Sequence, residues 1–244
     1  MDCMHDLQNN LRFLWHALAN KQGWKIKESV DAMLMRAPTT CSYFNMLWAD
    51  KLKLPSGTGY RDFFQDNSFL HITPDTKDTA PKTHRFTRCA NLRTIPTPPT
   101  PSEPNLKFKE VSQTPLLLRF IQNMADAFKM DVRLLDQVVR DIASVSPLYM
   151  AFDGDQPVAQ AHMVLDMHKT AGIYMAIGDK ASLYALTVFL WQVTKERGAE
   201  KLLFIERKDD KAPIYRLFPE RSNMYAAISH TAYKPKTAQS REAV

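Results

Sequence analysis

The most constraining feature of this 244-residue chain is a strand-helix-strand pattern within residues 170–218. Residues 170–177 form a short apolar run that ends at Gly178-Asp179, which is typical of a buried strand. Apolar residues then recur at helical spacing over 181–197, and Gly198 follows at the position of a helix C-terminal cap. A second apolar run occupies 201–205. The pattern predicts a β-α-β crossover that joins two parallel strands of one sheet.

The junction between the first strand and the helix has two interpretations. A helix that starts at the end of a strand offers free N–H groups and a positive dipole end to an anion. Asp179 stands at the start of this helix, where a carboxylate caps the helix and occupies the same N–H groups. The sequence leaves both interpretations open.

Composition indicates a globular protein with a substantial core, since 45% of the residues are hydrophobic and 24% are charged. No apolar run approaches the roughly 18 residues that a membrane span needs, and the N-terminus lacks the pattern of a secretory signal. We therefore expect a cytoplasmic protein without membrane partners. The net charge of +6 is scattered along the chain, so it is weak evidence for a nucleic-acid-binding module, and an anionic small ligand explains it equally well.

The three cysteines, Cys3, Cys41 and Cys89, are odd in number and far apart in the sequence. They form no C-x-x-C pair, and no histidine pair has the spacing of H-E-x-x-H. The sequence thus predicts neither a disulfide framework nor a metal site, and it fits a reducing compartment.

A proline-rich segment divides the chain. Residues 96–104 contain five prolines in nine positions, which favours a semi-rigid linker without regular secondary structure. We expect an N-terminal half over 1–95, this linker, a C-terminal domain over 105–230 and a flexible tail over 231–244. In the N-terminal half the patterns predict a helix over 7–20 and strands over 32–36, 62–72 and 84–95.

The C-terminal part has stronger signals. A strand over 106–111 precedes helices over 116–128 and 132–142, with Thr114 as the predicted N-cap. Strands over 148–152 and 158–166 flank the turn Asp153-Gly154-Asp155, which predicts a hairpin. The crossover follows, then a short helix over 212–218 and a last strand over 224–229.

This order of elements resembles the GNAT (Gcn5-related N-acetyltransferase) fold. Residues 148–154 with 157–159 are similar to the second and third strands of that family, and 171–174 to its fourth. Arg197-Gly198-Ala199 resembles the end of its central helix, and residues 213–218 resemble its terminal tyrosine helix. The resemblance implies an α/β (α+β) fold with a mixed, mostly antiparallel sheet around the central crossover. Gly23-Trp24 and residues 42–45 further suggest that the N-terminal half is a smaller, degenerate GNAT-like copy.

The resemblance also implies an acyl-CoA-dependent N-acyltransferase, with acetyl-CoA as co-substrate and a primary amine of a small molecule or protein as acceptor. Tyr215 takes the place of the family's general acid, and Glu206 and His162 are the candidate bases. A packed aromatic, a surface carboxylate and a core histidine are the respective alternatives. The residues expected to contact the cofactor are Tyr174, Met175, Ala176, Ile177, Gly178, Lys180, Ala181 and Ser182.

The chain departs from the family at the loop that binds pyrophosphate. The family pattern is [Gln/Arg]-x-x-Gly-x-[Gly/Ala] before the central helix, whereas residues 178–182 lack it and the segment is shorter. This motivates an alternative, a catalytically inactive GNAT-fold interaction or regulatory protein that has lost the CoA loop, such as a bacterial effector. Neither the acceptor nor the oligomeric state follows from the sequence.

Overall fold

The N-terminal part of the chain folds into a long amphipathic helix followed by short strands. The computed structural model describes residues 3–29, 32–49, 59–65, 67–74, 84–99, 105–207 and 216–229. The elements of the N-terminal part are α1 (Cys3–Leu18), β1 (Lys25–Glu28), β2 (Ala32–Arg36), the 3-10 helix η1 (Ser42–Phe44), β3 (Met46–Ala49), α2 (Gly59–Phe64), β4 (Phe69–Pro74) and β5 (His84–Asn91). In α1 the buried face carries Leu7, Leu11 and Leu14, which accounts for its amphipathic pattern.

The C-terminal part has longer elements and contains the predicted crossover. Its elements are β6 (Lys107–Glu110), α3 (Thr114–Phe128), α4 (Arg133–Ala143), β7 (Leu148–Asp153), β8 (Gln156–Leu165), β9 (Thr170–Gly178), α5 (Lys180–Glu196), β10 (Lys201–Arg207) and β11 (Glu220–Ser229). β6 to β9 form an antiparallel series, and β10 runs parallel to β9 after α5. The predicted β-α-β crossover and mixed sheet are thus confirmed. None of the helices in the described ranges combines the length and the hydropathy that a membrane span requires.

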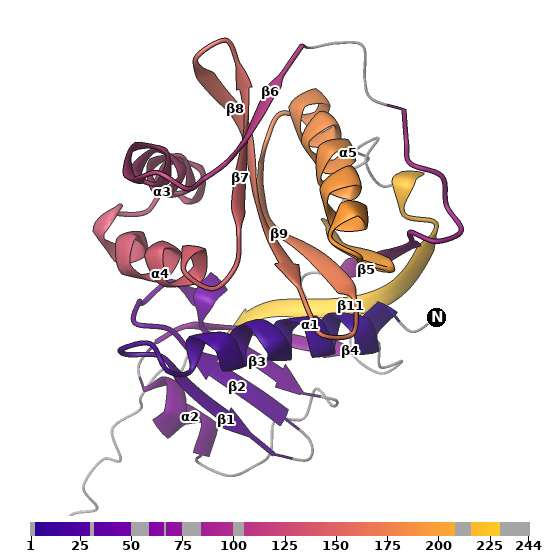
Figure 1. The fold of residues 1–244 in the computed structure, drawn as a ribbon. Helices are drawn as coiled ribbons and strands as arrows, with labels where there is room; N and C mark the ends of the chain where they lie inside the picture. The colour runs from indigo at the N-terminus through magenta and orange to yellow at the C-terminus, as the bar shows by residue number, and fades with distance from the viewer. Residues whose placement is uncertain are drawn as a thin grey trace, which may run out of the picture.

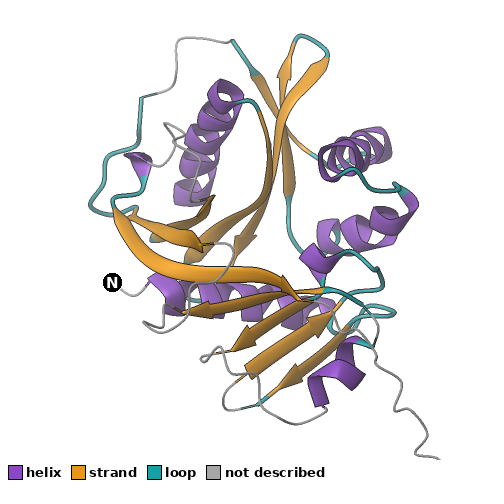
Figure 2. Ribbon diagram, turned by 180° about the vertical axis from the view of Figure 1, so that it is seen from behind, coloured by secondary structure: helices purple, strands orange, loops and turns teal. Residues whose placement is uncertain are grey.

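The described strands of both parts join in one sheet (Figure 1). Its order is β1-β2-β3-β4-β11-β5-β10-β9-β8-β7-β6. β5, from before the proline-rich segment, lies between β10 and β11, and β11 lies between β4 and β5. Each part of the chain therefore inserts one strand among the strands of the other. Figure 2 shows the long β11 crossing the centre of the molecule.

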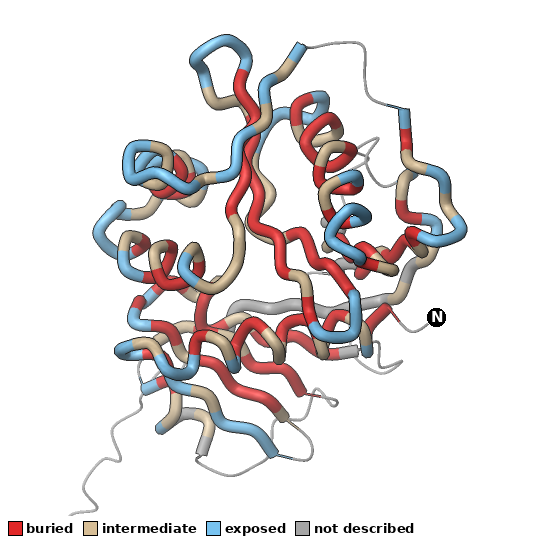
Figure 3. The backbone as a smooth tube through the Cα atoms, viewed as in Figure 1, coloured by how far each residue is buried: buried red, intermediate tan, exposed pale blue. Residues whose placement is uncertain are grey.

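The two faces of the sheet are covered differently. One face carries a continuous core beneath α1, α3 and α4, and residues of both parts contribute to it. On the other face α5 packs over the C-terminal strands, with Leu186, Leu190 and Trp191 buried. The short α2 packs over β2, β3 and β4 through Phe64, whose ring stacks on that of Phe69. In Figure 3 the sheet-facing sides of these elements are mostly buried.

Two local predictions were wrong. Residues 62–72 were expected to form one strand, but α2 occupies 59–64 and β4 begins only at Phe69. The stacked rings of Phe64 and Phe69 explain the difference, because these two residues would lie too far apart to stack in one continuous strand. Thr114 is not the N-cap of α3, since the helix begins at this residue and the preceding Gln113 makes no side-chain cap.

Candidate active site

The candidate site lies where β9 and β10 separate. The two strands pair in parallel over four positions, from Thr170 with Lys201 to Ile173 with Phe204. Beyond Ile173, β9 continues beside β8, whereas β10 continues beside β5 as far as Arg207. Figures 1 and 2 show β9 rising away from β5 and β11. The backbone of β9 after Ile173 therefore has β8 on one side and is no longer paired with β10 on the other.

The separating part of β9 is irregular. Its register with β8 shifts between the pairs at Gln160 and His162, opposite residues 174–177. Met175 in this segment has a φ of 50°, a left-handed conformation that costs free energy for a residue with a side chain. A bulge of this kind bends a strand and redirects its backbone N–H and C=O groups.

The start of α5 is capped by its own chain. The Asp179 Oδ1 atom accepts hydrogen bonds from the backbone N–H of Ala181 at 2.9 Å and of Ser182 at 3.0 Å. The hydrogen bonds from Ser182 lower the pKa of the Asp179 carboxyl, so this group is ionised at neutral pH. Of the two interpretations that the sequence left open, the structure has the capped helix.

Gly178 meets a packing requirement at this junction. Its φ is 151°, and a Cβ atom built on it would lie 2.7 Å from both the Val158 carbonyl oxygen and the Ala159 Cβ. The close approach of the strand end to β8 is thus sufficient to explain the glycine.

A buried polar network ties α1 to the point where β9 begins to separate. The Asn10 side chain accepts a 2.7 Å hydrogen bond from the Tyr174 hydroxyl. Its amide donates to the Thr170 carbonyl at 2.8 Å, to the Val164 carbonyl at 3.2 Å and to the Asp166 carboxylate at 3.1 Å. Burial, with Asp166 nearby, raises the pKa of the Tyr174 hydroxyl, which stays protonated and serves as a donor.

Sequence reasoning missed Asn10 and Asp166. Asn10 lies on the same helical face as Leu7, Leu11 and Leu14, and it is fully buried. A polar residue on an otherwise apolar helix face is the signal that could have identified it, because buried polar groups need partners. Its partners lie about 160 residues later in the chain, and no local pattern indicates them.

His162 is a buried histidine of β8, within the sheet. It is 1% exposed, and its Nε2 atom hydrogen-bonds with the Ser146 hydroxyl. Burial lowers the pKa of the imidazole to about 3, so the ring is neutral at physiological pH. Its centroid lies 6.1 Å from that of the Tyr174 ring. His162 is therefore close to the separating segment, with the environment of a core residue.

The other two predicted catalytic residues are less fully described. Tyr215 lies outside the described residues. Glu206 belongs to β10, where it pairs with Phe86 of β5, and its side chain also lies outside the described part. Glu206 lies two positions after Phe204, in the part of β10 that no longer pairs with β9.

The residues predicted to contact the cofactor form two adjoining groups. Tyr174, Met175, Ala176, Ile177 and Gly178 follow one another along the separating end of β9. Lys180, Ala181 and Ser182 form the first turn of α5. The structure brings these two groups together, with Asp179 between them.

Comparison with known proteins identifies the fold. No protein-family model and no curated protein sequence matches the chain. Among solved structures, a GCN5-related N-acetyltransferase from Kribbella flavida covers 93% of this chain and 95% of its own, with a TM-score of 0.64 and 9% identity. A GNAT-family protein from Novosphingobium aromaticivorans covers 92% and 97%, with a TM-score of 0.59 and 14% identity.

A tandem GNAT protein of clavulanic acid biosynthesis covers 91% of this chain and 87% of its own, with a TM-score of 0.50 and 9% identity. At these identities the similarity concerns the fold. Because the alignments extend over nearly the whole chain, the fold is that of GNAT proteins, as the sequence resemblance predicted.

Proposed function

We propose that this chain is an acyltransferase that transfers an acyl group, acetyl in the simplest case, from coenzyme A to an amine. The observation that carries the proposal is the separation of β9 from β10 after Ile173 and Phe204. An extended pantetheine arm can add to the free edge of β9 as another strand would, through backbone hydrogen bonds. The similarity to solved structures of GNAT acetyltransferases supports this assignment.

Of the two parts of the acyl-CoA donor, the pantetheine arm fits the structure better than the pyrophosphate does. The bulged segment with Met175 supplies redirected backbone groups for the pantetheine arm. The α5 start does not fit a pyrophosphate, because the Asp179 carboxylate already accepts from two of its N–H groups and repels an anion. We therefore assign most of the donor affinity to the arm and little to the phosphates.

In the proposed reaction the amine nitrogen attacks the thioester carbonyl carbon. A C–N bond forms, the C–S bond breaks, and Tyr215 donates its hydroxyl proton to the departing thiolate sulfur. Glu206 accepts the proton that the amine loses, either directly or through water. We assign the base to Glu206 rather than His162, because burial keeps the His162 imidazole weakly basic and its Nε2 atom already has a partner.

One observation favours a second candidate function. The capped start of α5 is also what a GNAT-fold protein would have if it no longer bound coenzyme A. Such a protein would act through interactions with a partner. The two candidates differ in whether the separating end of β9 binds a thioester arm.

Calorimetric titration separates these candidates. Acetyl-CoA, CoA and acetyl-pantetheine are titrated in turn into the full chain. We expect binding of acetyl-CoA and acetyl-pantetheine with affinities within about tenfold, equivalent to about 1.4 kcal/mol, since the phosphates contribute little. Absence of binding at millimolar concentrations of all three would reject the enzyme assignment.

Variants then test the assigned roles. Tyr215→Phe is expected to lower turnover of acetyl-CoA with an amine while leaving the dissociation constant unchanged. Glu206→Gln should act in the same way. Arg216→Lys, an exposed neighbour on the same segment, is the matched control.

The division of the chain belongs to the same proposal. We take residues 1–95 as a degenerate GNAT-like half, 96–104 as a linker, 105–230 as the acyltransferase domain and 231–244 as a tail. Support comes from the parallel pair in each half and from the similarity to a tandem GNAT protein. A cytoplasmic location fits the buried cysteines, none of which forms a disulfide.

A further inference from the structure

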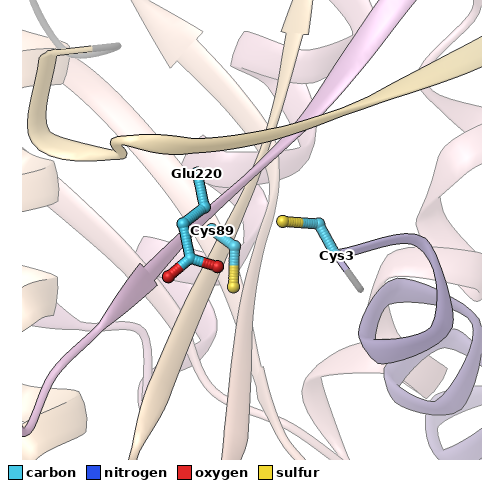
Figure 4. A group of neighbouring side chains, drawn as sticks. All are labelled: Cys3, Cys89 and Glu220. Carbon is cyan, nitrogen blue, oxygen red and sulfur yellow. The ribbon is translucent and has the colours of Figure 1, made fainter. Parts of the chain in front are cut away.

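Three side chains with metal-binding atoms meet beneath the start of α1. They are Cys3 on α1, Cys89 on β5 and Glu220 on β11, and their sulfur and carboxylate atoms all lie within 4.8 Å of one another. Figure 4 shows Cys3 pointing toward Cys89, with the Glu220 carboxylate beside it. The two cysteines are buried and Glu220 is half-buried. The three residues lie on other elements than β9, α5 and β10, which carry the proposed donor-binding residues and Glu206.

The sheet itself sets two of the three positions. Cys89 and Glu220 are directly paired across β5 and β11, so their side chains project from the same face of the sheet. α1 packs on this face, and its first residue adds the third side chain. The three residues therefore converge because of the strand exchange, although they are far apart in the sequence.

The separations suit a tetrahedral ion. Zinc binds thiolate sulfur at about 2.3 Å and carboxylate oxygen at about 2.0–2.2 Å, which puts two thiolates of one tetrahedral site about 3.8 Å apart. The ligand atoms of the three residues all lie within 4.8 Å of one another. Each pair of atoms therefore has to approach by about 1 Å at most to reach the tetrahedral separation. The Glu220 side chain has three rotatable bonds, and Cys3 is at a helix end, so a small adjustment of side chains is sufficient.

We propose that Cys3, Cys89 and Glu220 form a binding site for a thiophilic divalent cation, zinc being the fitting choice. Two thiolates and one carboxylate supply three ligands. Because Glu220 is only half-buried, water can occupy the fourth coordination position on that side of the ion. The Lys201 ammonium on β10, the strand beside β5, is paired with the Asp6 carboxylate of α1 at 2.8 Å, so this neighbouring pair adds no net charge to the site. The ion would join α1, β5 and β11, the elements through which the two halves are interwoven.

The test uses the full chain, reduced and freed of metal by a chelator that is then removed. Zinc is titrated by calorimetry, and cobalt is added as a spectroscopic probe. We expect one ion per chain, a rise in Tm with zinc, and the visible and charge-transfer absorption of tetrahedral thiolate-bound cobalt. Cys3→Ser and Cys89→Ser should each weaken binding by more than the roughly 10–100-fold cost of losing an outer-shell partner.

Cys41→Ser is the matched control, since Cys41 is equally buried but lies outside the cluster. Glu220→Gln should keep the sulfur-to-cobalt absorption and weaken affinity. The proposal is overturned if the reduced protein binds no stoichiometric zinc, or if binding persists in both Cys3→Ser and Cys89→Ser. Should Cys89→Ser fail to fold, Cys3→Ser alone decides, because it changes one atom at the first described residue of α1.

Discussion

The sheet contains two parallel strand pairs among its described strands, one in each half of the chain, and they differ in the helix that connects them. β3 with β4 and β9 with β10 occupy equivalent places, each beside one strand borrowed from the other half. Between β9 and β10 the chain forms the 17-residue α5, whereas between β3 and β4 it forms the six-residue α2. The halves thus share an arrangement of strands but differ in the crossover helix.

The difference in the crossover helix indicates which half carries the candidate site and which half supports it. α5 is long enough to cover the C-terminal strands and to start from a defined cap beside the separating strand. A helix of six residues has fewer than two turns, which provides little dipole and little buried area. We infer that the C-terminal pair carries the site, and that the N-terminal half supports it through α1 and β5.

The largest expected effect comes from separating the halves. Expressed alone, residues 105–244 lack β5, which pairs with both β10 and β11. We expect this fragment to show no cooperative unfolding transition, and co-expression with residues 1–104 to restore one. Circular dichroism during urea denaturation measures it. A cooperative transition of the isolated fragment would mean that the exchange is not essential.

Asn10→Ala tests, at a single residue, how strongly the C-terminal strands depend on the N-terminal half. The change leaves buried partners on β8 and β9, the Tyr174 hydroxyl and the Thr170 carbonyl among them, without the Asn10 hydrogen bonds. The Thr170 carbonyl still accepts from the Asp166 N–H, so the Tyr174 hydroxyl is the main group left unsatisfied. Since an unsatisfied buried group costs about 1–3 kcal/mol, we expect a loss of about 1–3 kcal/mol in unfolding free energy. Asn9→Ala, one position away, should change it by less than about 0.5 kcal/mol. Equal effects would contradict the network.

His162 should make the C-terminal half sensitive to acid. Its pKa of about 3 in the folded state lies below that of an unfolded histidine, so the unfolded chain binds a proton first as pH falls. Stability from this residue is complete above about pH 6.5 and declines by about 1.4 kcal/mol per pH unit toward pH 3. Between pH 7 and 5 wild type should lose about 2 kcal/mol more than His162→Gln.

Urea unfolding of both proteins across this pH range provides the measurement. His168→Gln, at an exposed position, is the control and should follow the wild-type curve. Parallel curves for wild type and His162→Gln would show that His162 is not held neutral by burial.

Asp179 gives the smallest effect and the most specific one. Asp179→Ala removes the cap of α5 and should cost about 1 kcal/mol of stability, whereas Asp179→Asn should cost less because it keeps an acceptor. Removing the charge should also tighten CoA binding by up to about fivefold, which corresponds to about 1 kcal/mol at a helix N-terminus. Asp155→Ala, in the β7–β8 turn, controls for net charge. Weaker CoA binding in Asp179→Ala would contradict the proposed repulsion.

The sequence was most informative where local patterns were strong. The apolar runs around Gly178 and Gly198 predicted β9, α5 and β10, and Asp153-Gly154 predicted the β7–β8 hairpin. The strand exchange was not predicted, because β5 and β11 carry alternating or mixed residues that indicate a strand without indicating its neighbours. The meeting of Cys3 with Cys89 also depends on this exchange, and the spacing of the cysteines in the sequence does not indicate it.

The candidate site was predicted in part for the same reason. Residues 174–178 were assigned to the donor through the resemblance to the GNAT fold, and Asp179 was identified from its place at a helix start. Asn10 escaped notice since its four partners lie in the other half of the chain. The roles assigned to Tyr215 and Glu206 remain predictions.

Hydrogen exchange of the backbone amides tests the central claim most directly. The full chain is exchanged in deuterated buffer with and without saturating acetyl-CoA, and peptides covering β9 and β3 are compared. Amides of residues 174–178 should exchange more slowly when the pantetheine arm pairs with β9, whereas those of β3, Met46–Ala49, should not change. No change in β9, or equal protection of both strand pairs, would contradict a donor site confined to the C-terminal half.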